Sequence, residues 1–256
     1  MRLLALDTAT EACSAALWVD GDVAERYAVA PRQHATLILP MVQSLLAEAQ
    51  LELTGLDAIA FGCGPGSFTG VRIATGVVQG LALGAELPVA PISDLAALAQ
   101  RGRIEPDCDE VWVAFDARMD EVYWGIYGFD EHGMACAIRA DCVVSPDQVR
   151  VRDDGVDPRS VATGRTVYAM GGGWSAYGAR LNAALGGVEP RIHADYLPRA
   201  WQIAELAVRR VRDGELLPPE RALPTYLRNE VARRPTVAAA RIAESRLIDH
   251  GKETQR

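Results

Sequence analysis

Two acidic residues, Asp7 and Asp116, each end a short apolar run that has the length of a buried β-strand. Hydroxyl groups and main-chain amides in the turn after such an acid can bind the oxygens of a phosphate. The second turn carries bulky side chains where close approach to a phosphate favours glycine. The polar residues of the two turns are Thr8 and Thr10 after the first acid and Arg118 after the second.

A third turn, Gly64-Pro65-Gly66, lies between a predicted strand and a predicted helix. It does not fit a P-loop, because the spacing from Gly64 to Gly70 is one residue too long and no lysine follows. It does not fit the dinucleotide fingerprint either, because the third glycine is missing. Pro65 also has no N–H to offer a phosphate. We therefore expect a structural elbow, with Ser67 as the N-cap of the helix.

The composition excludes several kinds of site. The chain has 256 residues and a net charge of −8, which argues against a standalone nucleic-acid binder. Lys252 is the only lysine, so we expect neither a lysine nucleophile nor a P-loop lysine in the folded body. The four histidines lack metal-binding spacing, and the five cysteines form no C-x-x-C pair, so we expect no metal. Because we find neither a signal peptide nor an apolar run of about 18 residues, we expect a cytoplasmic protein without membrane contact.

Three glycines, Gly76, Gly80 and Gly84, recur at four-residue spacing in the predicted helix after the elbow. Relative to alanine, Gly76 and Gly80 together cost about 2 kcal/mol of helix stability. Close approach of another backbone would offset this cost. The spacing alone leaves open whether that backbone belongs to the same chain or to another protein.

The predicted strands repeat. The sequence opens with strand, acid, strand, turn and strand, and the same series recurs after a polar break near residue 105. Such internal similarity indicates duplication. We expect an N-terminal lobe at 1–105, a C-terminal lobe at 106–234 and a tail at 235–256 that is either a loosely held helix or disordered.

Two lobes of this kind resemble the actin, Hsp70 and sugar-kinase ATPase superfamily. The resemblance implies an α/β fold of two duplicated RNase H-like lobes, whose acid-tipped turns face a cleft for the phosphates of a nucleotide. The glycine turn at 171–173 fits the superfamily's adenosine turn. Because the turn after Asp116 lacks glycine, we expect either weak ATP or ADP binding or none, with no cofactor required. The candidate cleft residues are Asp7, Thr8, Thr10, Asp116, Arg118, Gly171, Gly172 and Gly173.

A known family has motifs similar to four segments of this chain, Asp7–Ser14, Gly64–Ile73, Asp116–Trp124 and Tyr226–Ala232. This is the TsaB (YeaZ) family of bacterial tRNA threonylcarbamoyladenosine biosynthesis proteins, and the resemblance runs from Met1 to about Arg234. It implies a non-catalytic subunit that pairs with TsaD, a paralogous transferase, and with TsaE, an ATPase. Together they modify the tRNA adenosine beside the anticodon.

The resemblance also implies a difference from TsaD. TsaD binds its catalytic metal through a histidine pair. Here the matching residues 91–96 contain no histidine. The resemblance therefore implies that this chain kept the fold and lost the chemistry. It implies contact with tRNA only through the complex, and it leaves open a homodimer of the isolated chain.

Two predicted helices, 35–49 and 69–83, are the expected contact with TsaD. The alternative is that both helices only cover the sheet of the first lobe. The expected contact residues are Leu37, Ile38, Met41, Val42, Leu45, Thr69, Ile73, Gly76, Val77 and Gly80.

Two other functions stay open. One is an independent ATP-dependent small-molecule kinase, which the superfamily resemblance allows. The other is a peptidase, an activity attached to the wider glycoprotease-like family. The sequence shows no Ser/His/Asp constellation to support it.

Overall fold

The first of two sheets is built from the N-terminal part of the chain. Its strands are β1 (Arg2–Asp7), β2 (Ala12–Val19), β3 (Asp22–Val29), β4 (Ala58–Gly62) and β5 (Val89–Ile92). They lie in the order β3-β2-β1-β4-β5, with β1 antiparallel to β2 and parallel to β4. The computed structural model describes residues 1–105, 107–151, 164–186 and 188–228.

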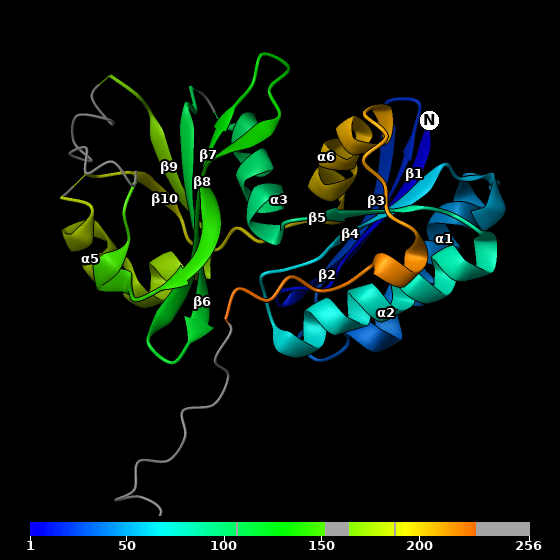
Figure 1. Ribbon diagram of the computed structural model, residues 1–256, viewed down its shortest axis with the longest axis horizontal. Coiled ribbons are helices and arrows are strands. Elements are labelled where there is room, and N and C mark those ends of the chain that lie inside the picture. The colour runs from blue at the N-terminus through cyan, green and yellow to red at the C-terminus, as the bar shows by residue number, and fades with distance from the viewer. Residues whose placement is uncertain (106, 152–163, 187, 229–256) are drawn as a thin grey trace, which may run out of the picture.

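The second sheet repeats the first and lies beside it (Figure 1). Its strands are β6 (Glu110–Arg118), β7 (Glu121–Phe129), β8 (Ala135–Val144), β9 (Val167–Met170) and β10 (Arg191–His193). The order is β10-β9-β6-β7-β8, again with the first strand antiparallel to the second and parallel to the fourth. The predicted fold class is confirmed as an α/β fold of two duplicated RNase H-like lobes, because both five-stranded sheets have the same strand order.

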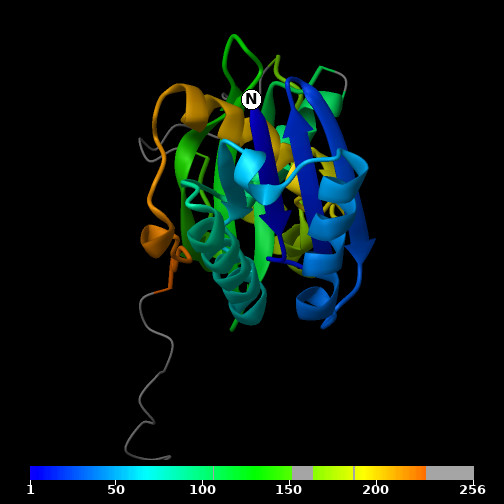
Figure 2. The same ribbon diagram turned by 90° about the vertical axis from the view of Figure 1, so that its right-hand side faces the viewer.

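Alternate residues of β1 face opposite sides of the first sheet, and different helices cover each side. Leu4 and Leu6 belong to the core with α1 and α2, whereas Leu3 and Ala5 belong to the core with α6. Figure 1 shows α1 and α2 below the sheet and α6 above it, and Figure 2 turns the first lobe toward the viewer. The helices are α1 (His34–Glu48), α2 (Phe68–Ala85) and α6 (Ala200–Arg212).

The second sheet is also covered on both sides. On one side, α5 (Gly172–Ala184) brings Trp174 against Trp124, whose ring centroid lies 6.0 Å away. On the other side, α3 (Asp94–Gln100) packs Leu95 and Leu98 against β6 and β9. Short 3-10 helices complete the described elements: η1 (Leu53–Gly55), η2 (Arg101–Ile104), η3 (Pro146–Gln148) and η4 (Pro219–Arg221).

The two lobes exchange helices, which corrects the predicted domain boundary at residue 105. α3 precedes that boundary, yet it packs on the second sheet. α6 follows it, yet Ile203 and Ala207 are buried against the first sheet. The segments 1–105 and 106–234 are therefore not separately packed lobes, because each sheet is covered by a helix from the other segment. The predicted tail, 235–256, lies outside the described residues.

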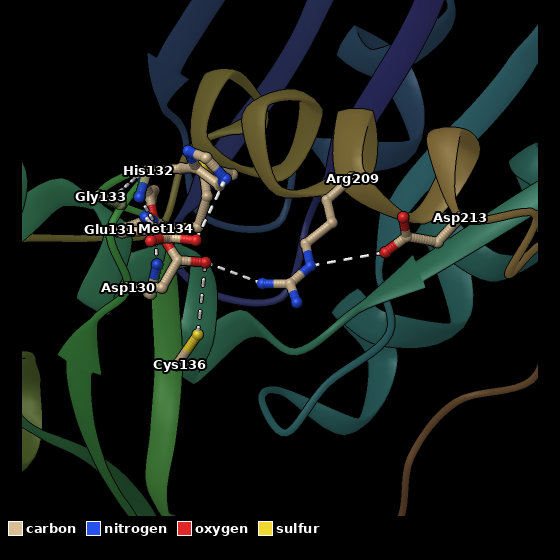
Figure 3. A network of polar contacts seen from close by, with 10 residues as sticks. Asp130, Glu131, His132, Gly133, Met134, Cys136, Arg209 and Asp213 are labelled. Carbon is tan, nitrogen blue, oxygen red and sulfur yellow. Dashed lines mark hydrogen bonds and ion pairs between the residues drawn. The ribbon is translucent and has the colours of Figure 1, made fainter.

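Polar contacts fasten α6 to the hairpin between β7 and β8 (Figure 3). Arg209 of α6 donates a hydrogen bond of 2.8 Å to Asp130, and it also pairs with Asp213 in the next turn. Glu205 of α6 accepts hydrogen bonds from Gln100 and Arg103. These contacts join elements of both lobes along one side of the molecule.

Candidate functional site

The turn after β1 is bonded internally and to the elbow. Asp7 Oδ1 accepts a hydrogen bond of 2.7 Å from the Ala9 amide, and the buried Thr8 hydroxyl donates to the carbonyl of Gly70 at 2.7 Å. The Ser67 amide donates to the carbonyl of Ala9 at 2.7 Å. The hydroxyl that was predicted to face a phosphate is therefore already used inside the first lobe. Thr10 is half-buried, and its hydroxyl accepts from the Ala12 amide at 3.3 Å.

The glycines of the elbow allow this close contact. A Cβ on Gly66 would lie 2.6 Å from the Ala9 carbonyl oxygen, and one on Gly70 would lie 2.0 Å from the Thr8 carbonyl oxygen. Gly64 has φ +103°, as the predicted tight reversal requires, and the Ser67 side chain caps α2 by accepting from the Gly70 amide at 3.3 Å. The tight turn and its close main-chain contacts therefore explain why glycine stands at Gly64, Gly66 and Gly70.

The turn at the end of β6 repeats the bond from the carboxylate to the amide two residues further on, but its backbone differs. Asp116 Oδ1 accepts from the Arg118 amide at 2.8 Å, and Asp116 Oδ2 pairs with the Arg118 guanidinium at 2.9 Å. Arg118, Met119 and Asp120 have φ values of 61°, 57° and 62°, in the left-handed region that favours glycine. The second turn thus keeps a backbone suited to glycine while carrying three larger side chains.

A C-terminal strap, residues 222–228, connects the first lobe to this second turn. The strap starts beside α2, where Gln79 donates to the Ala222 carbonyl at 2.8 Å. It passes the elbow, where the Thr225 amide donates to the Cys63 carbonyl at 2.7 Å. It ends with Arg228, which donates to the Ala117 and Arg118 carbonyls at 3.1 and 3.3 Å and pairs with Glu121.

The predicted adenosine turn is explained by close packing. A Cβ on Gly171 would lie 2.6 Å from the Ala114 carbonyl oxygen, and one on Gly173 would lie 2.8 Å from the same atom. Gly171 also has φ +99°. Only Gly172 would have open space at its Cβ. Two of the three glycines are therefore required by the second lobe's own backbone.

A buried acid that we did not predict lies next to Asp7. Asp94, the first residue of α3, is fully buried, and its Oδ2 accepts from the Gly64 amide. Burial raises the pKa of Asp7 to about 6. It also raises the pKa of Asp94 well above its usual value, with the charge of Asp7 as the second cause. The one signal in the sequence was an acid directly after a helix-capping serine, and this pattern is usual at exposed helix starts.

The residues predicted to contact a partner divide into a buried set and a set that is only partly buried. Ile38, Val42 and Leu45 lie in the core of the first lobe with exposed fractions of 0, 3 and 1%. They were predicted as contacts with a partner, and this prediction is wrong because the sheet covers them. Leu37 and Met41 are only partly buried.

The outer face of α2 has no covering element among the described residues. Thr69, Gly76 and Gly80 are exposed, Ile73 and Val77 are half-buried, and a Cβ on Gly76 or Gly80 would meet nothing within 4 Å. No backbone of the described chain therefore approaches the glycine stripe. In the part of the chain that the structure describes, α2 is the one helix whose length and hydropathy would suit a membrane span, but its inner face packs on the first sheet.

Comparisons with known proteins agree with the sequence motifs. The sequence model of the family "TsaD: tRNA N6-adenosine threonylcarbamoyltransferase" matches residues 27–232. The tRNA threonylcarbamoyladenosine biosynthesis protein TsaB of Escherichia coli (strain K12) is 42% identical over 91% of this chain and 96% of its own length. TsaB of Haemophilus influenzae is 39% identical over 90% of this chain and 95% of its own length.

A solved structure of YeaZ from Pseudomonas aeruginosa is similar throughout. It has a TM-score of 0.78 and 44% identity, over 88% of this chain and 99% of that chain. The likeness therefore covers most of the chain, not one motif alone. From these matches and the repeated sheet order, the chain belongs to the TsaB (YeaZ) family.

Proposed function

We propose that this chain is a non-catalytic subunit that pairs with a TsaD transferase, and with TsaE, in the threonylcarbamoyladenosine modification of tRNA beside the anticodon. The family membership supports the pathway, because the curated relatives carry the name of tRNA threonylcarbamoyladenosine biosynthesis proteins. The pairing rests on one structural observation, the uncovered glycine stripe of α2. The proposed site of action is the cytoplasm.

The glycine stripe is the observation that carries the pairing. Glycines inside a helix are unfavourable by about 1 kcal/mol each relative to alanine, so they need a compensating contact. Nothing lies within 4 Å of a Cβ on Gly76 or Gly80, so that contact is absent from the described chain. A partner helix that packs closely on α2 would supply it, with Ile73 and Val77 beside the stripe and Leu37 and Met41 on α1.

The polar groups of the turns after Asp7 and Asp116 already bond within the chain, and this supports the non-catalytic part of the proposal. The Thr8 hydroxyl bonds to Gly70, and the Asp116 carboxylate pairs with Arg118. A phosphate would have to displace both contacts. We therefore propose that no cofactor is required and that ATP or ADP binds weakly or not at all, which disfavours the kinase alternative.

The test is co-purification with TsaD. Gly76→Leu and Gly80→Leu place a large side chain on the proposed contact face, where it meets no atom of the described chain within 4 Å of its Cβ. We expect both variants to fold and to lose the complex. Gly178→Leu is the matched control, because Gly178 lies in α5 and its Cβ would also meet open space. Full recovery of the complex with Gly80→Leu would show that the interface lies elsewhere.

A further inference from the structure

The carboxyl groups of Asp7 and Asp94 converge at the end of β4. A Cβ on Gly62 would lie 2.2 Å from Asp94 Oδ1 and 3.0 Å from Asp7 Oδ1, so only glycine leaves room for both groups. The two acids come from different elements, β1 and α3, and both are fully buried. Their meeting point is therefore enclosed by protein.

Each acid has one oxygen held by the main chain and one without a partner. Asp7 Oδ1 accepts from the Ala9 amide at 2.7 Å, and Asp94 Oδ2 accepts from the Gly64 amide. The other oxygens, Asp7 Oδ2 and Asp94 Oδ1, are buried and have no donor when both groups are ionised. Two carboxylates cannot bond to each other, whereas a carboxylic acid can donate to a carboxylate.

The surroundings supply no cation to the pair. Among the described residues, no group of three or more His, Cys, Asp and Glu side chains is arranged to hold a metal ion. The other charges that act on the pair are acids, Glu25 on Asp7 and Asp141 on Asp94, and Glu25 is itself paired with Arg199. The titratable or charged groups around the pair are Cys13 from β2, Glu25 and Tyr27 from β3, Cys63 from β4, Tyr127 from β7, Asp141 from β8, and from α6 and its start Arg199, through Glu25, and Arg210, through Cys63.

We propose that Asp7 and Asp94 form a proton-binding site, in which one proton on Asp94 is donated to the free oxygen of Asp7. The shared proton links the turn after β1 to the start of α3. Through the Gly64 amide it also holds the elbow that leads into α2. Asp141 does not need this proton, because the Ser93 and Tyr127 hydroxyls already donate to its two oxygens.

The proposed site makes folding take up a proton. Burial raises the pKa of Asp7 from 3.8 to about 6 and raises the pKa of Asp94 well above its usual value. A raised pKa gives stability that is complete below the unfolded value of 3.8 and is lost as pH rises through the folded value. Between these two pH values, each proton that the folded state binds and the unfolded state does not bind makes the unfolding equilibrium constant rise about tenfold for each unit of increase in pH.

The test is urea unfolding of the full chain at a series of pH values from mildly acidic to mildly alkaline. We expect the unfolding constant of the parent to rise with pH and that of Asp94→Asn to rise distinctly less, because an amide can donate to Asp7 without titrating. Asp22→Asn removes an exposed carboxyl from the same lobe and should keep the parent's slope. An unchanged slope in Asp94→Asn would overturn the proposal.

Infrared spectroscopy gives a readout that does not depend on the stability of the variants. The folded parent at neutral pH should show the C=O stretch of a protonated carboxyl group, which ionised carboxylates lack. We expect this band to persist in Asp141→Asn and to disappear in Asp94→Asn. Absence of the band in the parent would contradict the shared proton, and its loss in Asp141→Asn alone would place the proton on Asp141 instead.

Discussion

Arg118, Met119 and Asp120 form a turn whose backbone is unusual for their residue types. Their φ values of 61°, 57° and 62° fall where side chains are disfavoured, at a cost of about 1–3 kcal/mol for each residue. Two arginines hold the turn from outside, because Arg228 donates to its carbonyls and Arg180 pairs with Asp120. These contacts support the shape of the turn, while the side chains of Arg118, Met119 and Asp120 are exposed.

At this scale we predict that Met119→Gly stabilises the protein. Glycine removes a left-handed backbone cost of about 1–2 kcal/mol, and the greater freedom of glycine in the unfolded chain costs about 0.5–1 kcal/mol, so the net gain in stability should be up to about 1.5 kcal/mol. Met119→Ala is the matched control, because it removes the same exposed side chain and keeps the Cβ. Urea unfolding measures both variants. A glycine variant less stable than the alanine variant would show that the turn is not strained.

The sequence could predict some site residues and not others. It predicted that Asp7 and Asp116 end equivalent strands: β1 does end at Asp7, whereas β6 continues two residues past Asp116, and each carboxylate accepts from the amide two residues further on. It could not predict that Asp94 meets Asp7, because the two residues are far apart in sequence and an acid at a helix start is ordinarily exposed. The contact arises only when α3 begins beneath the elbow.

α2 carries two kinds of glycine, and they illustrate the difference between internal packing and an uncovered face. Gly70 lies against the turn after β1, where the Thr8 carbonyl oxygen leaves no room for a Cβ. Gly80, three turns later in the same helix, faces open space. The first glycine is explained by the chain itself, and the second is not.

We predict opposite effects for the same substitution at these two sites. Gly70→Ala places a Cβ 2.0 Å from a main-chain oxygen and should destabilise the protein by about 1–3 kcal/mol, as overpacking usually does. Gly80→Ala should stabilise it by up to about 1 kcal/mol, because alanine favours the helix. Thermal or urea unfolding of the isolated chain measures both. Equal effects at the two sites would contradict the separation of inner and outer glycines.

The limits of sequence prediction at the element scale have a physical cause. Ser67 was identified as a helix cap from the local pattern, and its side-chain bond to the Gly70 amide confirms this. Ser93 caps α3 in the same way, by accepting from the Ala96 amide. Whether an apolar face meets a sheet or a partner is not a local property. For this reason the prediction failed for Ile38, which the first sheet buries completely.

At the scale of the whole molecule, the two lobes are interlocked. α3 and α6 are exchanged between the sheets, Arg209 joins α6 to the β7–β8 hairpin, and the strap at 222–228 bridges the elbow and the second turn. The repeated strand order was visible in the sequence as a duplication. The exchange was not, because an amphipathic helix shows that one face is buried and does not show which sheet covers it.

We propose that this fold serves a transferase as a partner and does no chemistry itself. The most direct measurement is threonylcarbamoyl transfer to tRNA, reconstituted with TsaD and TsaE in the presence of this chain, of its Gly80→Leu variant, or of neither. We predict modification with the parent chain, its loss with Gly80→Leu or when the chain is omitted, and none with this chain alone. Modification that continues unchanged without the chain, or turnover by the chain alone, would contradict the account.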